Sequence, residues 1–302
     1  MSAAPAFPRG VVPSMNTPFH DDGSVDLASI RRCAEATIQA GAAGMLILAV
    51  AGEGSSLSAI EKRQVTQAFI KQAAGRVPVI VGCSSSAAPE RLTLASMARE
   101  LGAPAMLCQV PDGMSGDALA SHLGELAQVG PPLLMLQDLD WAGAGLALED
   151  ITLLQRRFKA FQAIKIEVVL PGPKYSAVLA ASNGALHVSG GWAAAQMMEA
   201  LHRGVHAFMP TALDRVYGRI FSLFHDGQID AARALHARLA PVLAFSNQHI
   251  GVSIRFFKHL RQREGLFDTA LCRPGVPALD VHQMRELDAT VAYALALQSD
   301  IV

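Results

Sequence analysis

Short apolar runs recur along the chain at a spacing of about 20 to 35 residues, the length of one strand followed by one helix. Eight runs keep this spacing, at residues 10–15, 44–50, 77–83, 105–108, 133–137, 163–167, 185–189 and 206–209. Runs this apolar are typical of parallel strands that helices cover. The recurrence therefore predicts an α/β fold, a closed (β/α)8 TIM barrel.

The segments between the runs carry helix signals. Ser58 and Glu61 have the spacing of a capping box, and Pro89 suits the first turn of a helix. The alternative fold is a doubly wound open sheet. It is weakened because no G-x-G-x-x-G motif follows the first apolar run.

The chain continues well past the last apolar run in a stretch rich in alanine and leucine. Helical patterns lie near residues 213–224, 228–245, 250–263 and 281–298. We therefore expect the barrel to occupy residues 1–220 and a C-terminal helical domain to occupy residues 221–302, as an appendage to the barrel.

Composition excludes several functional classes. Of the 302 residues, 51% are hydrophobic and 17% charged, which excludes a disordered chain. A net charge of -1 removes the electrostatic attraction that nucleic acid or an anionic membrane would need. Mean hydropathy is +0.29, but the longest uncharged stretch, residues 40–52, is shorter than a spanning helix of about 20 residues. We expect no membrane and no nucleic-acid partner.

The cysteines and histidines predict neither disulfides nor a metal site. The four cysteines form no C-x-x-C pair, so we expect buried free thiols in a reducing compartment. His202 and His206 are four residues apart, but Gly204 breaks any helix that would carry both. His187 is expected to be a core histidine. The N-terminus lacks a signal-peptide pattern, and we expect a cytoplasmic protein without a metal or other cofactor.

One lysine stands apart from the other five. Lys62, Lys71, Lys159 and Lys258 lie in amphipathic helical patterns and Lys174 follows a proline-rich loop, so all five are expected to face solvent. Lys165 lies inside an apolar run instead, and strand alternation directs it to the barrel interior.

An interior lysine near the end of a barrel strand has two interpretations. The first is imine chemistry, which needs the free amine, whereas an unperturbed pKa near 10.4 leaves about one part in two thousand deprotonated at pH 7. The second is a structural ion pair with Glu167, which lies on the same side of the strand. Position alone leaves both open.

The motifs together resemble the dihydrodipicolinate synthase and N-acetylneuraminate lyase family of Schiff-base aldolases and dehydratases. The resemblance extends over nearly the whole chain. It is carried by residues 13–18, by the Gly-Glu loop at residues 49–57, by Ile164-Lys165-Ile166-Glu167, by Ser189-Gly190-Gly191-Trp192 and by Arg203-Gly204.

The resemblance implies an enzyme that is a homo-oligomer, a dimer or tetramer, and acts without a cofactor. It implies that Lys165 forms an imine with a 2-oxo acid, such as pyruvate or a keto-deoxy sugar acid. It places the substrate carboxylate at the Gly-Glu loop, which makes Val50, Ala51 and Ser55 candidate binding residues and Glu53 a candidate catalytic residue. Ser189, Gly190 and Trp192 are the binding candidates on the seventh strand.

Departures from the family pattern bear on the reaction. Gln137 occupies the position of a tyrosine that shuttles protons in the synthases and lyases, and an amide has no proton to exchange near neutral pH. Val50 and Ala51 replace loop threonines. A second tyrosine is missing from residues 109–112, and an arginine is missing from residues 139–143.

Gln137-Asp138 with Lys165-Ile166-Glu167 is similar to the 2-keto-3-deoxyarabonate dehydratases. On that reading Gln137 orients the substrate, and Glu53, Glu167 or Ser189 moves protons. The leading hypothesis is therefore a Schiff-base lyase, a dehydratase or retro-aldolase acting on a 2-keto-3-deoxy sugar acid. The alternatives are a pyruvate condensation of the dihydrodipicolinate synthase type and a catalytically decayed barrel that binds a 2-oxo acid.

Overall fold

The structure is a computed structural model that describes residues 6–301. Along the chain, eight strands alternate with helices, and further helices follow the last strand. The chain divides into two compact units, the first formed by residues 6–9 and 78–209 and the second by residues 10–77 and 210–301. The predicted boundary near residue 220 falls inside one helix, α8 (Asp214–His225), and the predicted division into domains stays a prediction.

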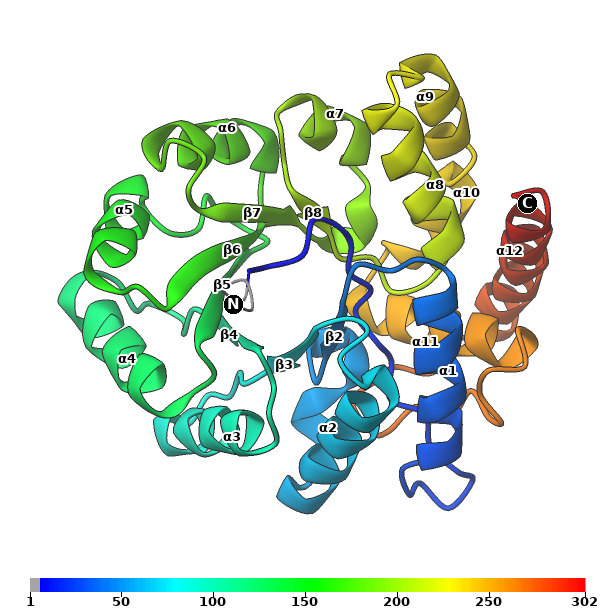
Figure 1. Ribbon diagram of the computed structural model, residues 1–302. Helices are drawn as coiled ribbons and strands as arrows, with labels where there is room; N and C mark the ends of the chain where they lie inside the picture. Colours follow the sequence, from blue (N-terminus) through cyan, green and yellow to red (C-terminus); the bar gives the residue numbers. More distant parts are fainter. Residues whose placement is uncertain (1–5, 302) are drawn as a thin grey trace. The chain divides into compact units, whose positions relative to one another are not determined.

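The first unit contains six parallel strands that are neighbours in chain order. They are β3 (Val79–Gly82), β4 (Ala105–Gln109), β5 (Leu133–Asp140), β6 (Phe161–Val168), β7 (His187–Gly190) and β8 (Ala207–Phe208). The helices between them are α3 (Ala88–Glu100), α4 (Gly116–Val129), α5 (Leu148–Arg157), α6 (Pro171–Ala181) and α7 (Met197–His202). Figure 1 shows these helices on one side of the six strands. Pro89 lies in the first turn of α3, as predicted.

The strand register aligns side chains of the first unit at one level. Gln109, Gln137, Lys165, Ser189 and Ala207 are successive Cα partners across β4 to β8. Because residues paired across a parallel sheet point to the same face, this row sets which side chains meet. The row brings Gln137 and Ser189 to either side of Lys165.

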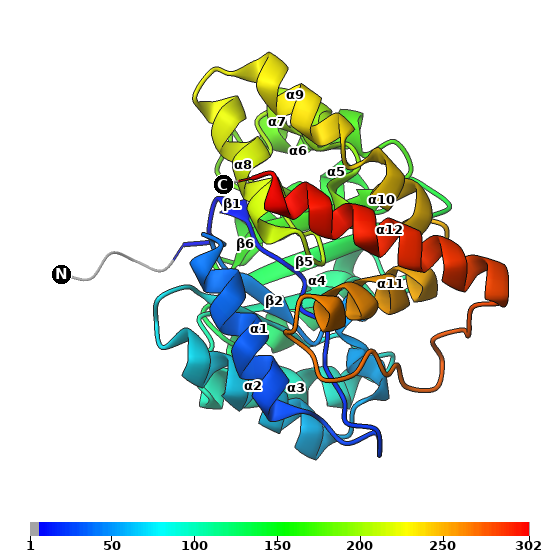
Figure 2. The same ribbon diagram turned by 90° about the vertical axis from the view of Figure 1, so that its right-hand side faces the viewer.

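The second unit begins with β1 (Gly10–Val11), α1 (Leu27–Gln39), β2 (Met45–Ile47) and α2 (Ala59–Ala73). Two 3-10 turns, η1 (Val50–Gly52) and η2 (Gly54–Ser56), lie between β2 and α2, and Ser58 and Glu61 form the predicted capping box. After α8 come α9 (Ile229–Ala237), α10 (Ala240–Ser246), α11 (Ile250–Arg263) and α12 (Val281–Ser299). The long helix α12 packs on α10 and α11 (Figure 2).

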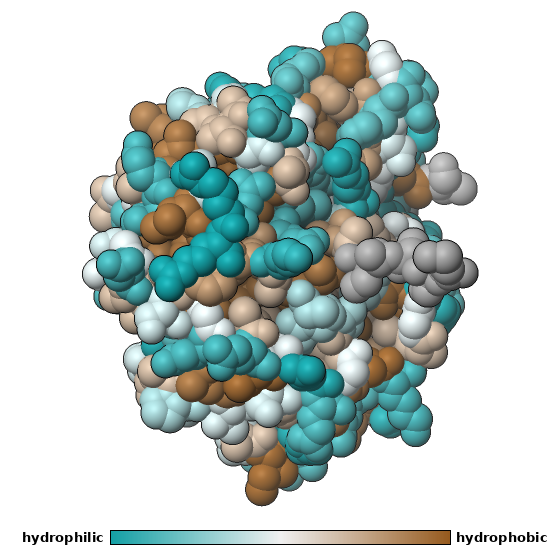
Figure 3. All heavy atoms as spheres, turned by 60° about the vertical axis from the view of Figure 1, so that its left-hand side comes forward, coloured by the Kyte–Doolittle hydropathy of each residue, from teal (hydrophilic) through white to brown (hydrophobic). Residues whose placement is uncertain are grey.

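Both units bury apolar side chains from strands and inward helix faces. On the face shown in Figure 3, hydrophilic and hydrophobic residues are interspersed. Within residues 6–301 no helix combines the length and hydropathy needed to cross a membrane. The four cysteines are free thiols as predicted, although Cys272 is only half-buried.

Candidate active site

Lys165 lies in the interior of the first unit, where strand alternation predicted it. Only 5% of its surface is exposed, and Ile164 and Ile166 on the opposite side of β6 are fully buried. Lys165 Nζ lies 3.1 Å from Glu167 Oε2. Lys165 and Glu167 therefore form the ion pair that the sequence left open. The surroundings of the pair bear on whether its role is structural or catalytic.

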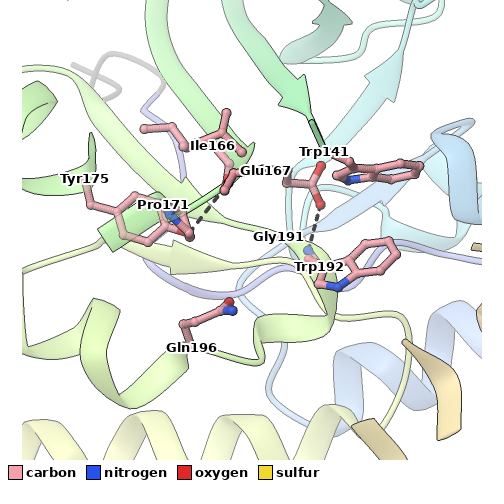
Figure 4. Close-up of a pocket in the computed structure, with 10 residues that line it drawn as sticks. Trp141, Ile166, Glu167, Pro171, Tyr175, Gly191, Trp192 and Gln196 are labelled. Carbon is pink, nitrogen blue, oxygen red and sulfur yellow. Dashed lines mark hydrogen bonds between the residues drawn. The ribbon is translucent and has the colours of Figure 1, made fainter. Parts of the chain in front are cut away.

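Glu167 connects the lysine to two other predicted site residues. Gln137 donates through Nε2 to Glu167 Oε2 at 2.5 Å. The backbone N–H of Trp192 donates to Oε1 at 2.7 Å, as Figure 4 shows. Burial alone would raise the pKa of Glu167. The nearby ammonium of Lys165 and the hydrogen bonds from Gln137 and Trp192 outweigh burial and hold that pKa below its usual range. The carboxylate is therefore charged at rest.

A cavity of about 270 Å³ opens beside this cluster. Glu167 lines it together with the side chains of Trp141 and Trp192 (Figure 4). The remaining lining residues are Ile166, Val168, Val169, Pro171, Tyr175, Gly191 and Gln196. Trp192, a binding candidate from the sequence, therefore forms a wall of the cavity.

Only glycine fits at position 191, because the Glu167 carboxylate occupies the space that a side chain would need. A Cβ atom on Gly191 would lie 2.0 Å from Glu167 Oε1. Gly190, beside it, approaches the ring of Tyr175, with a Cβ position 3.0 Å from the hydroxyl oxygen. Ser189 is fully buried, and its hydroxyl donates to the carbonyl of Ile164 at 3.4 Å. Of the predicted seventh-strand residues, Trp192 contacts the glutamate, whereas Ser189 and Gly190 lie against Ile164 and Tyr175.

The second unit holds the Gly-Glu loop. Val50 is 41% exposed, Ala51 is buried, and Ser55 is exposed. The carbonyl of Ala51 accepts a hydrogen bond from Asn16 Nδ2 at 2.7 Å. A Cβ on Gly54 would lie 2.2 Å from the carbonyl oxygen of Leu48, so only glycine fits this tight turn.

Glu53 is held inside this loop by two partners. Its Oε1 pairs with Lys258 Nζ, and its Oε2 accepts the backbone N–H of Arg273 at 2.8 Å. Glu53 has a left-handed backbone conformation (φ 53°), which costs free energy for a non-glycine residue. The two contacts hold that conformation in place, so Glu53 positions the loop within its unit.

The expectation that five lysines face solvent was wrong for three of them. Lys258 is fully buried because α11 buries more than one face, whereas Lys62 is 7% exposed because it lies on the one face that α2 buries. In α11 the neighbours Phe256, Phe257 and Leu260 are also buried. Aromatic residues directly before Lys258 were the signal in the sequence that could have revealed its burial.

Lys174 is the third exception. It lies in the first turns of α6 rather than in a loop, and its ammonium pairs with the buried Asp138 at 2.5 Å. Asp138 also accepts the backbone N–H of Leu146 at 2.9 Å. The aspartate therefore anchors the segment after β5, as expected of a residue at a strand end.

The histidines do not form a ligand set. His187 Nε2 lies 2.9 Å from the carbonyl oxygen of Pro8, and burial lowers its pKa to about 4. His206 accepts the backbone N–H of Val188 through Nδ1. Among the residues that the structure describes, no group of three or more His, Cys, Asp or Glu side chains could hold a metal ion.

Known proteins match this chain in sequence and in structure. A model of the Dihydrodipicolinate synthetase family matches residues 7–294. A 4-hydroxy-tetrahydrodipicolinate synthase of Xanthomonas axonopodis pv. citri is 29% identical over 96% of this chain and 96% of its own length. The match to the Erythrobacter litoralis synthase is 37% identical but spans 39% of this chain and 41% of that protein.

The fold is also found among solved structures. The pyruvate complex of a chloride-inhibited dihydrodipicolinate synthase from Acinetobacter baumannii superposes with a TM-score of 0.84 and 22% identity, over 98% of this chain and 100% of that one. The predicted fold class, a (β/α)8 TIM barrel with C-terminal helices, is thereby confirmed. At 22% identity, this match supports the fold but says nothing of the substrate.

Proposed function

Because the chain belongs to the dihydrodipicolinate synthetase family, we propose that Lys165 forms an imine with the C2 carbonyl of a 2-oxo acid and that the enzyme then makes or breaks a bond at C3. The observation that carries this proposal is the contact of Lys165 and Gln137 with the same oxygen of Glu167. An electron-withdrawing imine and a carboxylate within reach of its nitrogen are the two groups that proton transfer at C3 requires.

The resting ion pair is the starting point of the reaction. Lys165 must lose a proton before it attacks, and Glu167 lies 3.1 Å away, within direct reach of that proton. The amine adds to C2, Glu167 returns the proton to the departing hydroxyl group, and water leaves, which gives a protonated imine and restores the carboxylate. This imine carries the same positive charge as the ammonium, so Glu167 continues to stabilise it.

Glu167 then takes the role of the missing tyrosine. Its carboxylate accepts the C3 proton, and the electron pair moves into the imine to give an enamine. Gln137 has no proton to exchange, but its amide N–H orients the carboxylate. Glu53, Glu167 and Ser189 were the candidate proton carriers. Glu167 forms an ion pair with Lys165, whereas the Glu53 carboxylate pairs with Lys258.

We favour a dehydratase or retro-aldolase over condensation because Gln137 stands at the tyrosine position and residues 139–143 lack an arginine. Glu167 supplies the proton transfer at C3, which all of these reactions need. The keto-deoxy sugar acid implied by the resemblance stays a prediction, as do the homo-oligomer and the binding of the substrate carboxylate by Val50, Ala51 and Ser55.

Condensation of the dihydrodipicolinate synthase type is the second candidate. The relatives that match the chain are named as synthases of this kind, which favours it. Against it stand Gln137 at the tyrosine position and the lack of arginine in residues 139–143. A catalytically decayed barrel would bind the 2-oxo acid without exchanging its protons.

Deuterium exchange at C3 of pyruvate tests the proposal without knowledge of the second substrate. In heavy water, proton NMR should show the methyl signal of pyruvate disappearing in the presence of the protein. Glu167→Gln should still form the imine but lose about 10²-fold or more in exchange rate. No exchange by the wild type, with pyruvate bound, would favour the decayed barrel and overturn the proposal.

A further inference from the structure

We infer that Trp141 and Trp192 select the part of the 2-oxo acid beyond C3, and that this part is an aryl or branched alkyl group rather than a hydroxylated chain. The inference rests on the proposed function, because Lys165 is taken as the residue that holds C2. It follows from the cavity beside Glu167 and names the substrate class of that site. It departs from the sugar acid that the resemblance implies.

The cavity adjoins the reacting groups through Glu167. This carboxylate contacts Lys165 on one side and lines the cavity on the other. Lys165 itself does not line the cavity, so Glu167 is the link between the two. We place the substrate's C3 at Glu167, with its distal atoms extending toward Trp141 and Trp192. Figure 4 shows the glutamate between the strand and the two indole rings.

The two indoles form a continuous aromatic wall. Their ring centroids lie 5.0 Å apart at an interplanar angle of 56°, and they are the two tryptophans of the whole chain. Trp141 comes from the segment after β5 and Trp192 from the segment after β7. Two loops thus place their largest apolar side chains on one cavity, a placement typical of a specificity pocket.

The backbone at Trp192 is held in an unfavourable conformation. Its φ of 51° lies in the left-handed region, which is rare for a bulky residue. The hydrogen bond from its N–H to Glu167 Oε1 at 2.7 Å fixes this conformation. The carboxylate that we assign to proton transfer thereby also fixes the aromatic wall, so both act on one substrate.

The cavity offers few polar partners to a hydroxylated chain. Glu167 already accepts from Gln137 and Trp192, and the Tyr175 hydroxyl faces the carbonyl oxygen of Ile166 at 3.4 Å. Gln196 adds one amide to the lining, and the other lining residues are aliphatic, aromatic or glycine. Hydroxyls placed against the two indoles would exchange water for apolar neighbours, whereas an apolar group gains by burial there.

The volume admits an aromatic ring. An apolar protein cavity of about 150 Å³ holds benzene, and this cavity measures about 270 Å³. Pyruvate alone would leave the space beyond C3 unfilled. The expected preference is therefore for a 2-oxo acid that carries a ring or branched chain at C4.

Intrinsic tryptophan fluorescence tests the inference, because both tryptophans line the cavity. Titration with 2-oxo-4-phenylbutanoate, pyruvate and a 2-keto-3-deoxy sugar acid gives three dissociation constants, which calorimetry checks independently. We expect the phenyl compound to bind about tenfold or more tightly than either of the others. Trp141→Ala, at a half-exposed position, and Trp192→Phe should both reduce the ratio of phenyl-compound affinity to pyruvate affinity.

Leu170→Ala is the matched control, because Leu170 is 77% exposed and apolar but does not line the cavity. It should keep the wild-type preference. Equal affinity for the three compounds, or tighter binding of the sugar acid, with pyruvate still trapped on Lys165 by borohydride, would overturn this inference and leave the proposed function intact. Failure to trap any 2-oxo acid would instead overturn the proposed function, and with it this assignment.

Discussion

Two buried Lys–Glu pairs, one in each unit, differ in what surrounds them. Lys258 is fully buried, and its ammonium contacts Glu53, the carbonyl of Leu271 at 2.8 Å and the face of Phe19 at 4.1 Å from the ring centroid. Lys165 is 5% exposed and pairs with a glutamate that lines a cavity. The first pair is enclosed by protein groups, and the second borders space for a ligand.

Burial of a lysine beside a glutamate therefore does not by itself indicate a catalytic role. Enclosing both charges costs desolvation, which the pair recovers only through good geometry and further hydrogen bonds. Lys258 has these partners and connects α11 to the Gly-Glu loop. Lys165 also lies on the β6 motif that the family resemblance marks. We therefore propose a structural role for Lys258 and a catalytic role for Lys165, and substitutions test both.

The largest expected effect is on turnover. Lys165→Arg keeps the positive charge beside Glu167 but removes the nucleophilic amine, so deuterium exchange into pyruvate should fall by about 10³-fold or more. Lys258→Arg, the matched change in the enclosed pair, should leave the exchange rate per folded molecule near that of the wild type. Deuterium exchange that persists in Lys165→Arg would contradict the catalytic role proposed for Lys165.

The second effect is on stability. Lys258→Met leaves the Glu53 carboxylate buried without its cation, which should lower the free energy of unfolding by about 3 to 5 kcal/mol. Adding Glu53→Gln removes the unpaired charge and should restore part of that loss. Urea unfolding of the two single variants and the double variant measures the coupling. Strictly additive losses would show that the pair does not act as a unit.

A smaller loss should follow from Gly191→Ala. The new methyl group would collide with Glu167 Oε1 and displace the carboxylate from its position beside Lys165. Displacement of a catalytic group by about 1 Å costs about 10²-fold in rate. The borohydride adduct with pyruvate should persist while exchange falls, because the lysine itself is unchanged. Parallel loss of both would indicate that Gly191 supports imine formation instead.

The smallest effect concerns acid stability in the second unit. Hydrogen bonds from Arg273 lower the pKa of Glu61 from its usual 4.5 to about 2. Since the folded-state pKa is depressed, this contribution is fully present above pH 4.5 and is lost as the pH falls toward 2.

Glu61→Gln keeps the capping-box geometry but removes the titrating group. It should lower stability at neutral pH by about 1 to 3 kcal/mol and flatten the fall in stability over the acid range. Unfolding in urea at several pH values measures both quantities. An unchanged acid slope would show that other carboxyl groups carry the dependence.

The sequence was sufficient for the fold because its apolar runs and helix signals are local patterns. It also located Lys165, whose place on a strand follows from alternation alone. It could not show that Glu167 contacts Gln137 and Trp192, because those contacts depend on the register between strands. Lys258 was wrongly expected at the surface, since helical spacing does not reveal how many faces α11 buries. Lys174 was wrongly expected there too, since the local sequence does not show that its ammonium reaches the buried Asp138.

Site-resolved trapping tests the assignment of Lys165 most directly. The protein is reduced with borohydride in the presence of pyruvate, digested, and mapped by mass spectrometry, with Lys165→Arg as the control. We expect a pyruvate-derived adduct on the peptide that contains Lys165 and no modification of the peptide that contains Lys258. An adduct on Lys258, or an unmodified Lys165 in protein that exchanges the C3 protons of pyruvate, would contradict it.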